Sequence, residues 1–274
     1  MTRQTANVVS LSGGKDSTAM LLMMLERGEP IADIVFFDTG WEFPQMYAHL
    51  DALEQFTGQT ITRLRPRLPV GVNTDKTPFD WMFAEFPVVK RGTSQPHMIG
   101  RGWPAPMRRW CTGRKQESLR AHLLALTHRF GFTLPLQQCV GFAADEIQRL
   151  DGPTKRDGTY YVQRYPLIEW GVTEADALAY CKKRGFTWDG LYQYFSRVSC
   201  FCCPLQALDD LRNLRWFYPD LWQQMLEMDS WLTGSKGRRF NHAPSVAALE
   251  VRFAAEDADK LAEFAAIQEE LRNG

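Results

Sequence analysis

The chain has 274 residues, of which 45% are hydrophobic and 23% are charged, and its 32 basic residues balance its 32 acidic residues. This length and composition predict a packed protein of one large domain, or of one domain with a helical appendage. The zero formal charge argues against a globally basic nucleic-acid binder, although it leaves room for a local basic patch.

The N-terminal residues are polar and lack the pattern of a secretory signal, and no apolar run approaches the roughly 18 residues of a membrane span. We therefore expect a cytoplasmic protein without membrane contact. In that compartment thiols are kept reduced, so the six cysteines are expected to serve as core, metal-binding or redox residues rather than as disulfides.

Strands and helices alternate in the first part of the chain. Strands are expected at Asn7–Leu11, Ile31–Phe37 and Thr60–Leu64, and helices at Thr18–Arg27 and Phe43–Phe56. This alternation favours an α/β fold in which helices cover a parallel sheet.

The remainder of the chain predicts a change of architecture. Residues 65–113 are rich in proline and glycine and indicate a long excursion with short helices, of the kind that covers an active site. After it we expect a helix at Lys115–Arg129, a strand at Gln138–Phe142, an extended segment at Tyr160–Leu167, a helix capped by Thr173, and helices within Leu205–Leu232 and Ser245–Leu271. The predicted domains are an α/β domain, residues 1–170, and a helical part, residues 171–274.

The segment Ser12-Gly13-Gly14-Lys15-Asp16-Ser17 connects the first strand to the first helix. It does not satisfy the Walker A pattern, because no glycine stands at the first position and Asp16 follows the lysine. Two glycines allow a tight turn whose N–H groups, together with the positive end of the helix, attract an anion. Lys15 adds a charge, and hydroxyls are offered by Ser10, Ser12 and Ser17. A plain strand-to-helix turn is the alternative.

This segment resembles the pyrophosphate loop of the N-type ATP pyrophosphatases. The resemblance implies a Rossmann-like adenine-nucleotide hydrolase fold with a parallel sheet, and ATP–Mg²⁺ that adenylates a substrate and leaves pyrophosphate. By this resemblance the nucleotide is bound by Ser10, Ser12, Gly13, Gly14, Lys15, Asp16 and Ser17.

Four later segments resemble the phosphoadenosine phosphosulfate (PAPS) reductase family in order and spacing. They are Phe37–Pro44, Arg109–Lys115, Gly141–Arg149 and Tyr165–Trp170. The resemblance implies nucleotide or Mg²⁺ contacts from Asp38, Thr39, Gly40, Gly141, Asp145 and Glu146. It implies contacts to a substrate oxyanion from Arg114, Lys115 and Arg149. The alternatives are a turn aspartate at position 38, helix capping at 145 and 146, and solvated surface charges for the basic residues.

The run Cys200-x-x-Cys203-Pro204 presents thiolates on a tight turn, as iron–sulfur ligand runs do. Cys111 lies in a segment that the family places near the nucleotide. With Cys200 and Cys203 it would hold three irons of a [4Fe-4S] cluster and leave one iron open to carry hydrosulfide. Cys202 is a fourth ligand or a persulfide carrier. A structural zinc site, a redox pair and buried thiols are the alternatives. Cys139 and Cys181 are expected in the core.

The chain departs from PAPS reductases because no cysteine follows Cys203. The intact loop favours ATP as substrate and so the sulfurtransferase branch, with catalytic roles for Lys15, Asp16, Cys202 and Arg149. Reduction of adenylyl sulfate or PAPS to sulfite is the alternative, and a non-catalytic nucleotide-binding docking module is another. The expected partners are ATP or a sulfonucleotide, and a sulfur donor such as a cysteine desulfurase or a thiol reductant.

Two basic stretches are candidate binding surfaces for a nucleic-acid acceptor, and the first is also a candidate site for the phosphate of the substrate. One is the loop Ser235–His242, and the other is the excursion with Arg63, Arg65, Arg67, Lys90, Arg91, Arg101, Arg108 and Arg109. Solvated loop surface is the alternative for both stretches.

Overall fold

The structure is a computed structural model that describes residues 6–105, 109–130, 136–151, 161–232, 239–241 and 243–273. Its residues fall into two units, each with its own internal packing. The first unit joins Met1–Asn73 to Cys111–Phe201, and the second joins Thr74–Trp110 to Cys202–Gly274. The predicted boundary near residue 170 is a different partition, because the helices that directly follow it belong to the first unit.

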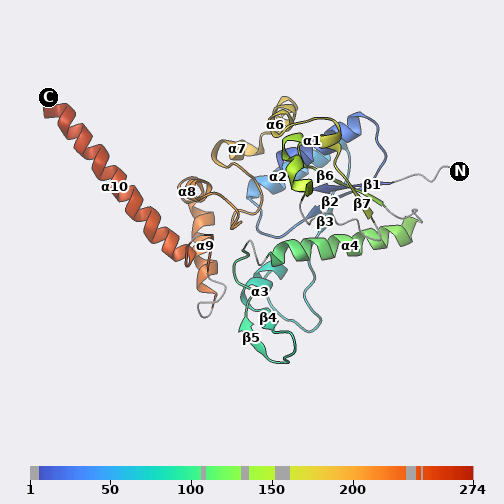
Figure 1. Ribbon diagram of the computed structural model, residues 1–274, viewed down its shortest axis with the longest axis horizontal. Coiled ribbons are helices and arrows are strands. Elements are labelled where there is room, and N and C mark those ends of the chain that lie inside the picture. Colours follow the sequence, from blue (N-terminus) through green and yellow to red (C-terminus); the bar gives the residue numbers. More distant parts are fainter. Residues whose placement is uncertain are drawn as a thin grey trace. The chain divides into compact units, whose positions relative to one another are not determined.

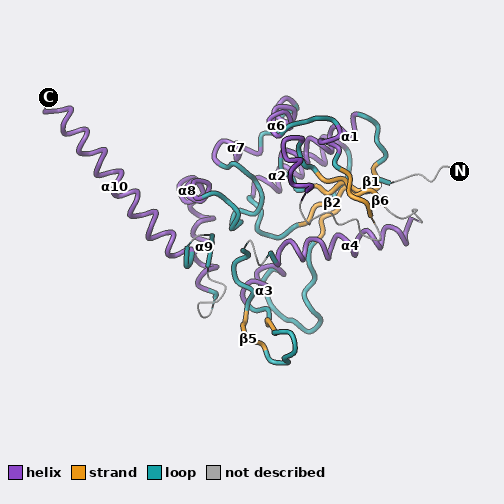
Figure 2. Tube along the Cα trace, viewed as in Figure 1, coloured by secondary structure: helices purple, strands orange, loops and turns teal. Residues whose placement is uncertain are grey.

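The first unit is built on a five-stranded parallel sheet (Figures 1 and 2). Its strands are β1 (Asn7–Leu11), β2 (Ile31–Phe37), β3 (Thr62–Leu64), β6 (Leu136–Val140) and β7 (Tyr161–Arg164). Its helices are α1 (Lys15–Glu26), α2 (Pro44–Thr57), α4 (Trp110–Phe130), α5 (Pro166–Glu169), α6 (Glu174–Lys183) and α7 (Leu191–Tyr194), with the 3-10 segments η1 (Ala144–Asp151) and η2 (Trp188–Gly190).

The strand order is β3-β2-β1-β6-β7. The chain therefore moves outward from β1 to β3 on one side and returns to the other side of β1 with β6. In open parallel sheets, ligands bind beyond the carboxyl ends of the strands at such a reversal. The predicted parallel α/β fold is confirmed, and the reversal places the end of β1 beside the end of β6.

Helices cover both faces of the sheet, with α4 on one side and α1, α2 and α6 on the other (Figure 1). The α4 face is a core in which Leu123 and Leu126 pack with Val8 of β1, Val35 of β2 and Leu136 of β6. Because side chains alternate along a strand, the neighbouring residues of β1 face the α1 layer. This alternation explains why the consecutive residues Val8 and Val9 of β1 are both fully buried.

One predicted helix differs from the observed one. Helix α4 begins at Trp110, five residues before the predicted start, so Cys111 and Arg114 lie on the helix. The helical segment expected within Leu205–Leu232 consists of α8 (Leu208–Phe217) and α9 (Pro219–Ser230). The break falls at Tyr218 because the proline that follows it cannot continue a helix, although it is well suited to start one.

The second unit contains α3 (Pro78–Ala84), a two-stranded sheet of β4 (Pro87–Val89) and β5 (Pro96–Ile99), α8, α9 and the long α10 (Val246–Asn273). Trp103 is fully buried between the rings of Phe83 and Phe240 and donates to Asp229 at 3.0 Å. Arg215 of α8 joins α10 through two carboxylates. None of the described helices combines the length and apolar character needed to cross a membrane.

The packing under α4 predicts the effect of one core substitution. Leu123→Ala removes a fully buried side chain from the layer between α4 and the sheet. We expect the free energy of unfolding to fall by about 2–5 kcal/mol, measured by urea denaturation. Arg120→Ala, at an exposed position of the same helix, should change it by less than about 0.5 kcal/mol. Equal effects of the two variants would contradict this core.

Candidate functional site

The pyrophosphate-type loop lies where β1 meets α1 at the reversal of strand order. Gly13 has a φ of +79°, and a Cβ built on it would lie 2.3 Å from Sδ of Met46 in α2. Gly141, which follows β6, lies so close that its Cβ would be 2.8 Å from the backbone N and Cα of Ser17. Gly141 is therefore required by close backbone packing, and Gly13 is favoured by its positive φ.

Hydroxyl groups hold the loop in shape. The Ser12 N–H donates to Oγ of Ser17 at 3.1 Å, the two serine hydroxyls lie 2.9 Å apart, and Ser17 Oγ donates to the Gly14 carbonyl. On β1, Ser10 accepts from the amide of Gln138 at 2.8 Å. In the part of the chain that the structure describes, the N–H group of Ser17 has no acceptor, whereas the N–H group of Asp16 interacts with the carboxylate of its own residue. Unpaired first-turn N–H groups are the usual partners of a bound anion.

The segment from η2 to α7 is hydrogen-bonded to the backbone of this loop. Trp188 donates its indole N–H to the Gly13 carbonyl at 2.7 Å, and the Tyr192 hydroxyl accepts from the Lys15 N–H at 2.8 Å. Trp188 also stacks on His49, whose Nε2 lies 2.9 Å from the Thr18 hydroxyl. The contacts of Trp188 and Tyr192 with the loop could not be predicted from the sequence, because no spacing rule connects residues that are more than 170 positions apart.

Lys15 is already paired in the absence of nucleotide. Its Nζ lies 3.1 Å from Asp16 Oδ2 and 3.0 Å from Glu174 Oε2 of α6. Burial disfavours the ammonium, but the two carboxylates outweigh it and the net pKa of Lys15 is raised. Burial also raises the pKa of Asp16, and Lys15 offsets only part of that rise. A bound polyphosphate would have to replace Glu174 as an ion-pair partner of Lys15.

The two carboxylate oxygens of Asp16 differ in their contacts. Its Oδ1 is buried and has no hydrogen-bond partner among the described residues, whereas Oδ2 meets Lys15. A buried carboxylate oxygen without a partner is costly unless a ligand or a cation completes it. A hard cation such as Mg²⁺ prefers oxygen ligands of this kind.

The predicted pair Asp145 and Glu146 lies at the start of η1. Asp145 accepts from the N–H of Glu174, the first residue of α6, at 3.1 Å, so it acts as a cap for that helix in this structure. Glu146 is buried and accepts from the Ala143 N–H at 3.4 Å. Asp145 thereby fixes the backbone of the residue whose side chain holds Lys15.

The segment after β2 folds around the buried carboxylate of Asp38. Its Oδ1 accepts from the Gly40 N–H at 2.9 Å and lies 2.8 Å from the Tyr47 hydroxyl. Its Oδ2 accepts from Arg65 at 2.7 Å. Both oxygens have partners, so the turn interpretation of Asp38 describes its contacts here, and a nucleotide contact stays a prediction.

The same segment meets the first cysteine of the C-x-x-C run. Thr39 donates its hydroxyl to the buried Glu42 at 2.7 Å, and the Cys200 thiol lies 3.5 Å from that hydroxyl and 3.8 Å from Glu42 Oε1. The backbones of Glu42 and Cys200 pair, and the Phe201 N–H donates to Trp41. The structure thus brings together two of the predicted motifs.

The six cysteines divide into two sets by burial. Cys111, Cys200 and Cys203 are half-buried, whereas Cys139, Cys181 and Cys202 are buried, and none of these six described cysteines forms a disulfide. Burial raises the pKa of Cys139 and that of Cys181 to about 12, which keeps both protonated as expected for core residues. Among the described residues, no three His, Cys, Asp or Glu side chains are grouped as a metal site.

The predicted oxyanion residues lie on two elements. Arg114 of α4 pairs with Glu117 at 2.6 Å, and the Lys115 amine lies 5.8 Å from the ring centre of Phe37, the last residue of β2. Arg149 lies in η1, but its side chain is outside the described part of the structure. Most of the predicted basic loop Ser235–His242 is likewise outside it.

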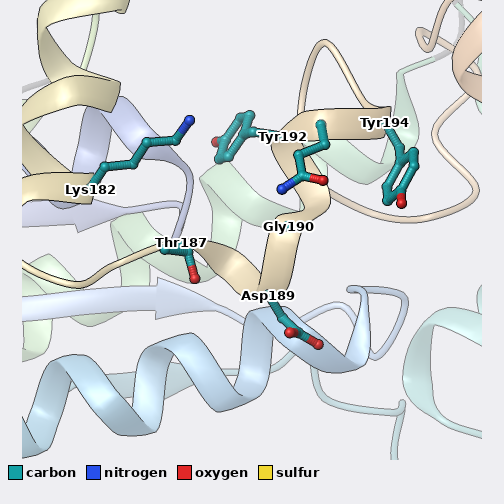
Figure 3. Close-up of a pocket in the computed structure, with 7 residues that line it drawn as sticks. Lys182, Thr187, Asp189, Gly190, Tyr192 and Tyr194 are labelled. Carbon is teal, nitrogen blue, oxygen red and sulfur yellow. The ribbon is translucent and has the colours of Figure 1, made fainter.

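A polar pocket of about 540 Å³ lies beside the loop (Figure 3). It is lined by Lys182, Thr187, Asp189, Gly190, Tyr192, Gln193 and Tyr194. The Lys182 amine points toward Tyr192 in the close-up. Because Tyr192 also accepts from the Lys15 N–H, any molecule that moves its ring from the pocket side disturbs the loop.

Comparison with known proteins identifies related chains. Residues 6–206 match the family profile of the phosphoadenosine phosphosulfate reductase domain. A curated relative, the uncharacterized protein MJ0066 of Methanocaldococcus jannaschii, is 25% identical over 222 residues, which are 79% of this chain and 40% of the relative. The chain therefore spans well under half the length of that relative.

Two solved structures are similar in chain trace. The phosphoadenylyl-sulfate (PAPS) reductase from Candida auris, in a phosphate complex, has a TM-score of 0.45 and 16% identity over 71% of this chain and 81% of that one. The U34-tRNA thiolase NcsA from Methanococcus maripaludis, with its [4Fe-4S] cluster, has a TM-score of 0.40 and 14% identity over 92% of this chain and 72% of that one.

Burial of His49 predicts a pH dependence of stability. Burial lowers the pKa of His49 to about 4, from about 6.5 in the unfolded chain. Between these values the unfolded chain binds the proton more tightly, so stability falls as the pH is lowered. We expect this group to cost about 2 kcal/mol on going from pH 7 to pH 5, measured by urea unfolding. His49→Gln should remove that difference, and His128→Gln at an exposed site should not. An unchanged pH profile for His49→Gln would contradict the assignment.

The Lys15–Glu174 pair predicts a gain in anion affinity. Glu174→Gln removes one of the two carboxylates that hold Lys15. We expect inorganic pyrophosphate to bind about two- to fivefold more tightly, the range of a partly exposed ion pair, in calorimetric titrations. Glu227→Gln, an equal charge change at an exposed position of α9, is the control. Weaker binding by Glu174→Gln would mean that Glu174 supports the anion site instead.

Proposed function

The chain belongs to the phosphoadenosine phosphosulfate reductase family, and from that premise we propose that it is an ATP-dependent sulfurtransferase. In this proposal it binds ATP with Mg²⁺, joins AMP to an oxygen of the acceptor with release of pyrophosphate, and then replaces that oxygen by sulfur. The sulfur enters at the oxidation level of sulfide, and AMP leaves with the oxygen.

The observation that best supports the proposal is the presence of polar groups without hydrogen-bond partners at the start of α1. The N–H group of Ser17 and the buried Oδ1 of Asp16 lack partners among the described residues, next to the ammonium of Lys15. Donors and a cation suit the oxygens of pyrophosphate, and the carboxylate oxygen suits a hard cation. The residues present therefore fit ATP–Mg²⁺, with Asp16 as the residue that would hold the cation.

The chain's own groups supply binding and orientation. Lys15 leaves Glu174 and neutralises the phosphates, and Ser12 and Ser17 keep the loop backbone in place for them. Stabilising the charge that develops on the leaving pyrophosphate lowers the barrier to adenylation. Gly141 lets the end of β6 approach the loop without a side chain in the way.

A [4Fe-4S] cluster is the second cofactor of the proposal. Thiols are its usual ligands, and the half-buried Cys111, Cys200 and Cys203 suit that role better than the buried cysteines. When bound, such a cluster supplies an iron without a protein ligand at which sulfur can be held. Cys202 is 1% exposed, which favours Cys203 over it as the second ligand of the run.

Reduction of adenylyl sulfate or PAPS to sulfite is the competing proposal, because the family takes its description from a reductase domain. Such a reaction needs a thiol nucleophile, and the chain contains no cysteine after Cys203. It also needs no pyrophosphate site, whereas the loop of this chain keeps Lys15, Asp16 and Ser17 together. These two features favour the transferase.

One set of assays on anaerobically purified protein tests the proposal. We expect a brown protein that releases pyrophosphate from ATP in the presence of acceptor and forms no sulfite from adenylyl sulfate. Lys15→Ala should lower pyrophosphate release roughly 100-fold, as loss of a charge-stabilising group does. Lys183→Ala on α6 should leave it unchanged. Cys200→Ser should bleach the visible absorption, and Cys202→Ser should keep it.

Three outcomes would overturn parts of this proposal. A colourless protein that contains zinc would exclude the cluster. Sulfite formation without use of ATP would identify a reductase. ATP binding without turnover on any nucleic-acid or small-molecule acceptor would favour a nucleotide-binding docking module.

A further inference from the structure

The charges of this chain are separated along its sequence. From Phe86 to Gln116 there is no acidic residue, although the whole chain carries equal numbers of acidic and basic ones. The basic residues of this stretch are Lys90, Arg91, Arg101, Arg108, Arg109, Arg114 and Lys115. A block of one sign inside a neutral protein concentrates potential on the element that carries it.

Two of these residues, Lys90 and Arg91, lie between the strands of the β4–β5 hairpin of the second unit. The two strands pair antiparallel, with Val88 opposite Met98, and Gly92 at the turn has a φ of +84°. Every residue from Val89 to His97 is exposed. The hairpin is therefore an open two-stranded ribbon whose backbone and tip are available to a partner.

The basic side chains at the tip are not neutralised by the protein. Lys90 and Arg91 are exposed, and neither makes an ion pair with a described residue. Several arginines elsewhere are paired with carboxylates, as Arg164, Arg184 and Arg215 are. The two basic side chains at the hairpin tip are therefore available to an anionic partner.

The base of the hairpin is firmly packed. Gly100, just after β5, lies so close to α3 that a Cβ on it would be 2.5 Å from the Phe83 carbonyl. The Arg101 guanidinium lies 3.9 Å from the ring centre of Phe86, and Trp103 is buried against Phe83. An exposed ribbon on a rigid aromatic base can bind without first being ordered, which lowers the entropy cost of binding.

We propose that the β4–β5 hairpin is a docking element for double-stranded DNA. The major groove of B-form DNA admits a two-stranded β-ribbon, whereas the deep, narrow major groove of A-form RNA does not. Lys90 and Arg91 contact phosphates on the groove walls, and the uncharged polar residues Thr93, Ser94 and Gln95 at the tip face the base edges. As a place that holds the sulfur acceptor, the hairpin rests on the proposed function; as a DNA-binding surface, it stands without it.

Binding of the full chain to a labelled duplex, measured by fluorescence anisotropy at rising salt concentration and without ATP, tests this proposal. We expect the double variant Lys90→Ala and Arg91→Ala to bind at least tenfold more weakly at low salt. The slope of log affinity against log salt should fall by about 2, because each phosphate contact contributes about 0.9. The matched control replaces the exposed Lys183 of α6 and Lys260 of α10 by alanine and should leave the slope unchanged.

Three results would overturn the proposal. They are no binding of duplex DNA at low salt, equal slopes for the hairpin variant and the wild type, and duplex RNA bound as tightly as duplex DNA. Circular dichroism verifies that the variants are folded, and both substituted side chains are exposed, so loss of folding is not expected. Since the assay contains no nucleotide, failure of the adenylation proposal leaves its result intact.

Discussion

The close approach of β6 to the start of α1 is the constraint on which the candidate site depends. There is no room for a side chain between Gly141 and the backbone of Ser17. That contact exists because the chain reverses its direction of travel across the sheet between β1 and β6. This contact fixes the residue at which α1 begins and therefore the direction of the N–H groups in the first turn of α1. The loop residues, the lysine and the buried carboxylate all take their positions from it.

Side chains from later parts of the sequence contact the loop. Tyr192 occupies the N–H of Lys15, Glu174 occupies its ammonium, and Trp188 fixes the carbonyl of Gly13. A phosphate that enters replaces existing contacts, so the backbone needs little rearrangement. Asp145 extends this arrangement, since it caps the helix that carries Glu174. The arrangement therefore links the loop to an acidic segment after β6.

The sequence predicted the local features well and the long-range ones poorly. Apolar runs and glycine positions located the strands of the sheet and the loop, because these depend on nearby residues. The partner of Lys15 lies 159 positions away in α6, and Asp38 is neutralised by Arg65 from beyond β3. Neither pairing follows from spacing, because the fold alone brings these side chains together. Within the predicted helical segment Leu205–Leu232, the start of α9 at Pro219 also follows from local sequence, since the missing N–H of proline favours the first turn of a helix.

Trp188 and Asp189 are consecutive non-glycine residues with positive φ, 52° and 50°. Such conformations cost on the order of 1 kcal/mol each and persist only where the surroundings enforce them. Here the indole bond to Gly13 and the stack on His49 do so. The turn and the loop therefore form one thermodynamic unit. Consider a molecule that binds in the neighbouring pocket only when Tyr192 no longer accepts from the Lys15 N–H. The factor by which this molecule changes the affinity of the loop for phosphate must equal the factor by which phosphate changes the affinity of the pocket for this molecule.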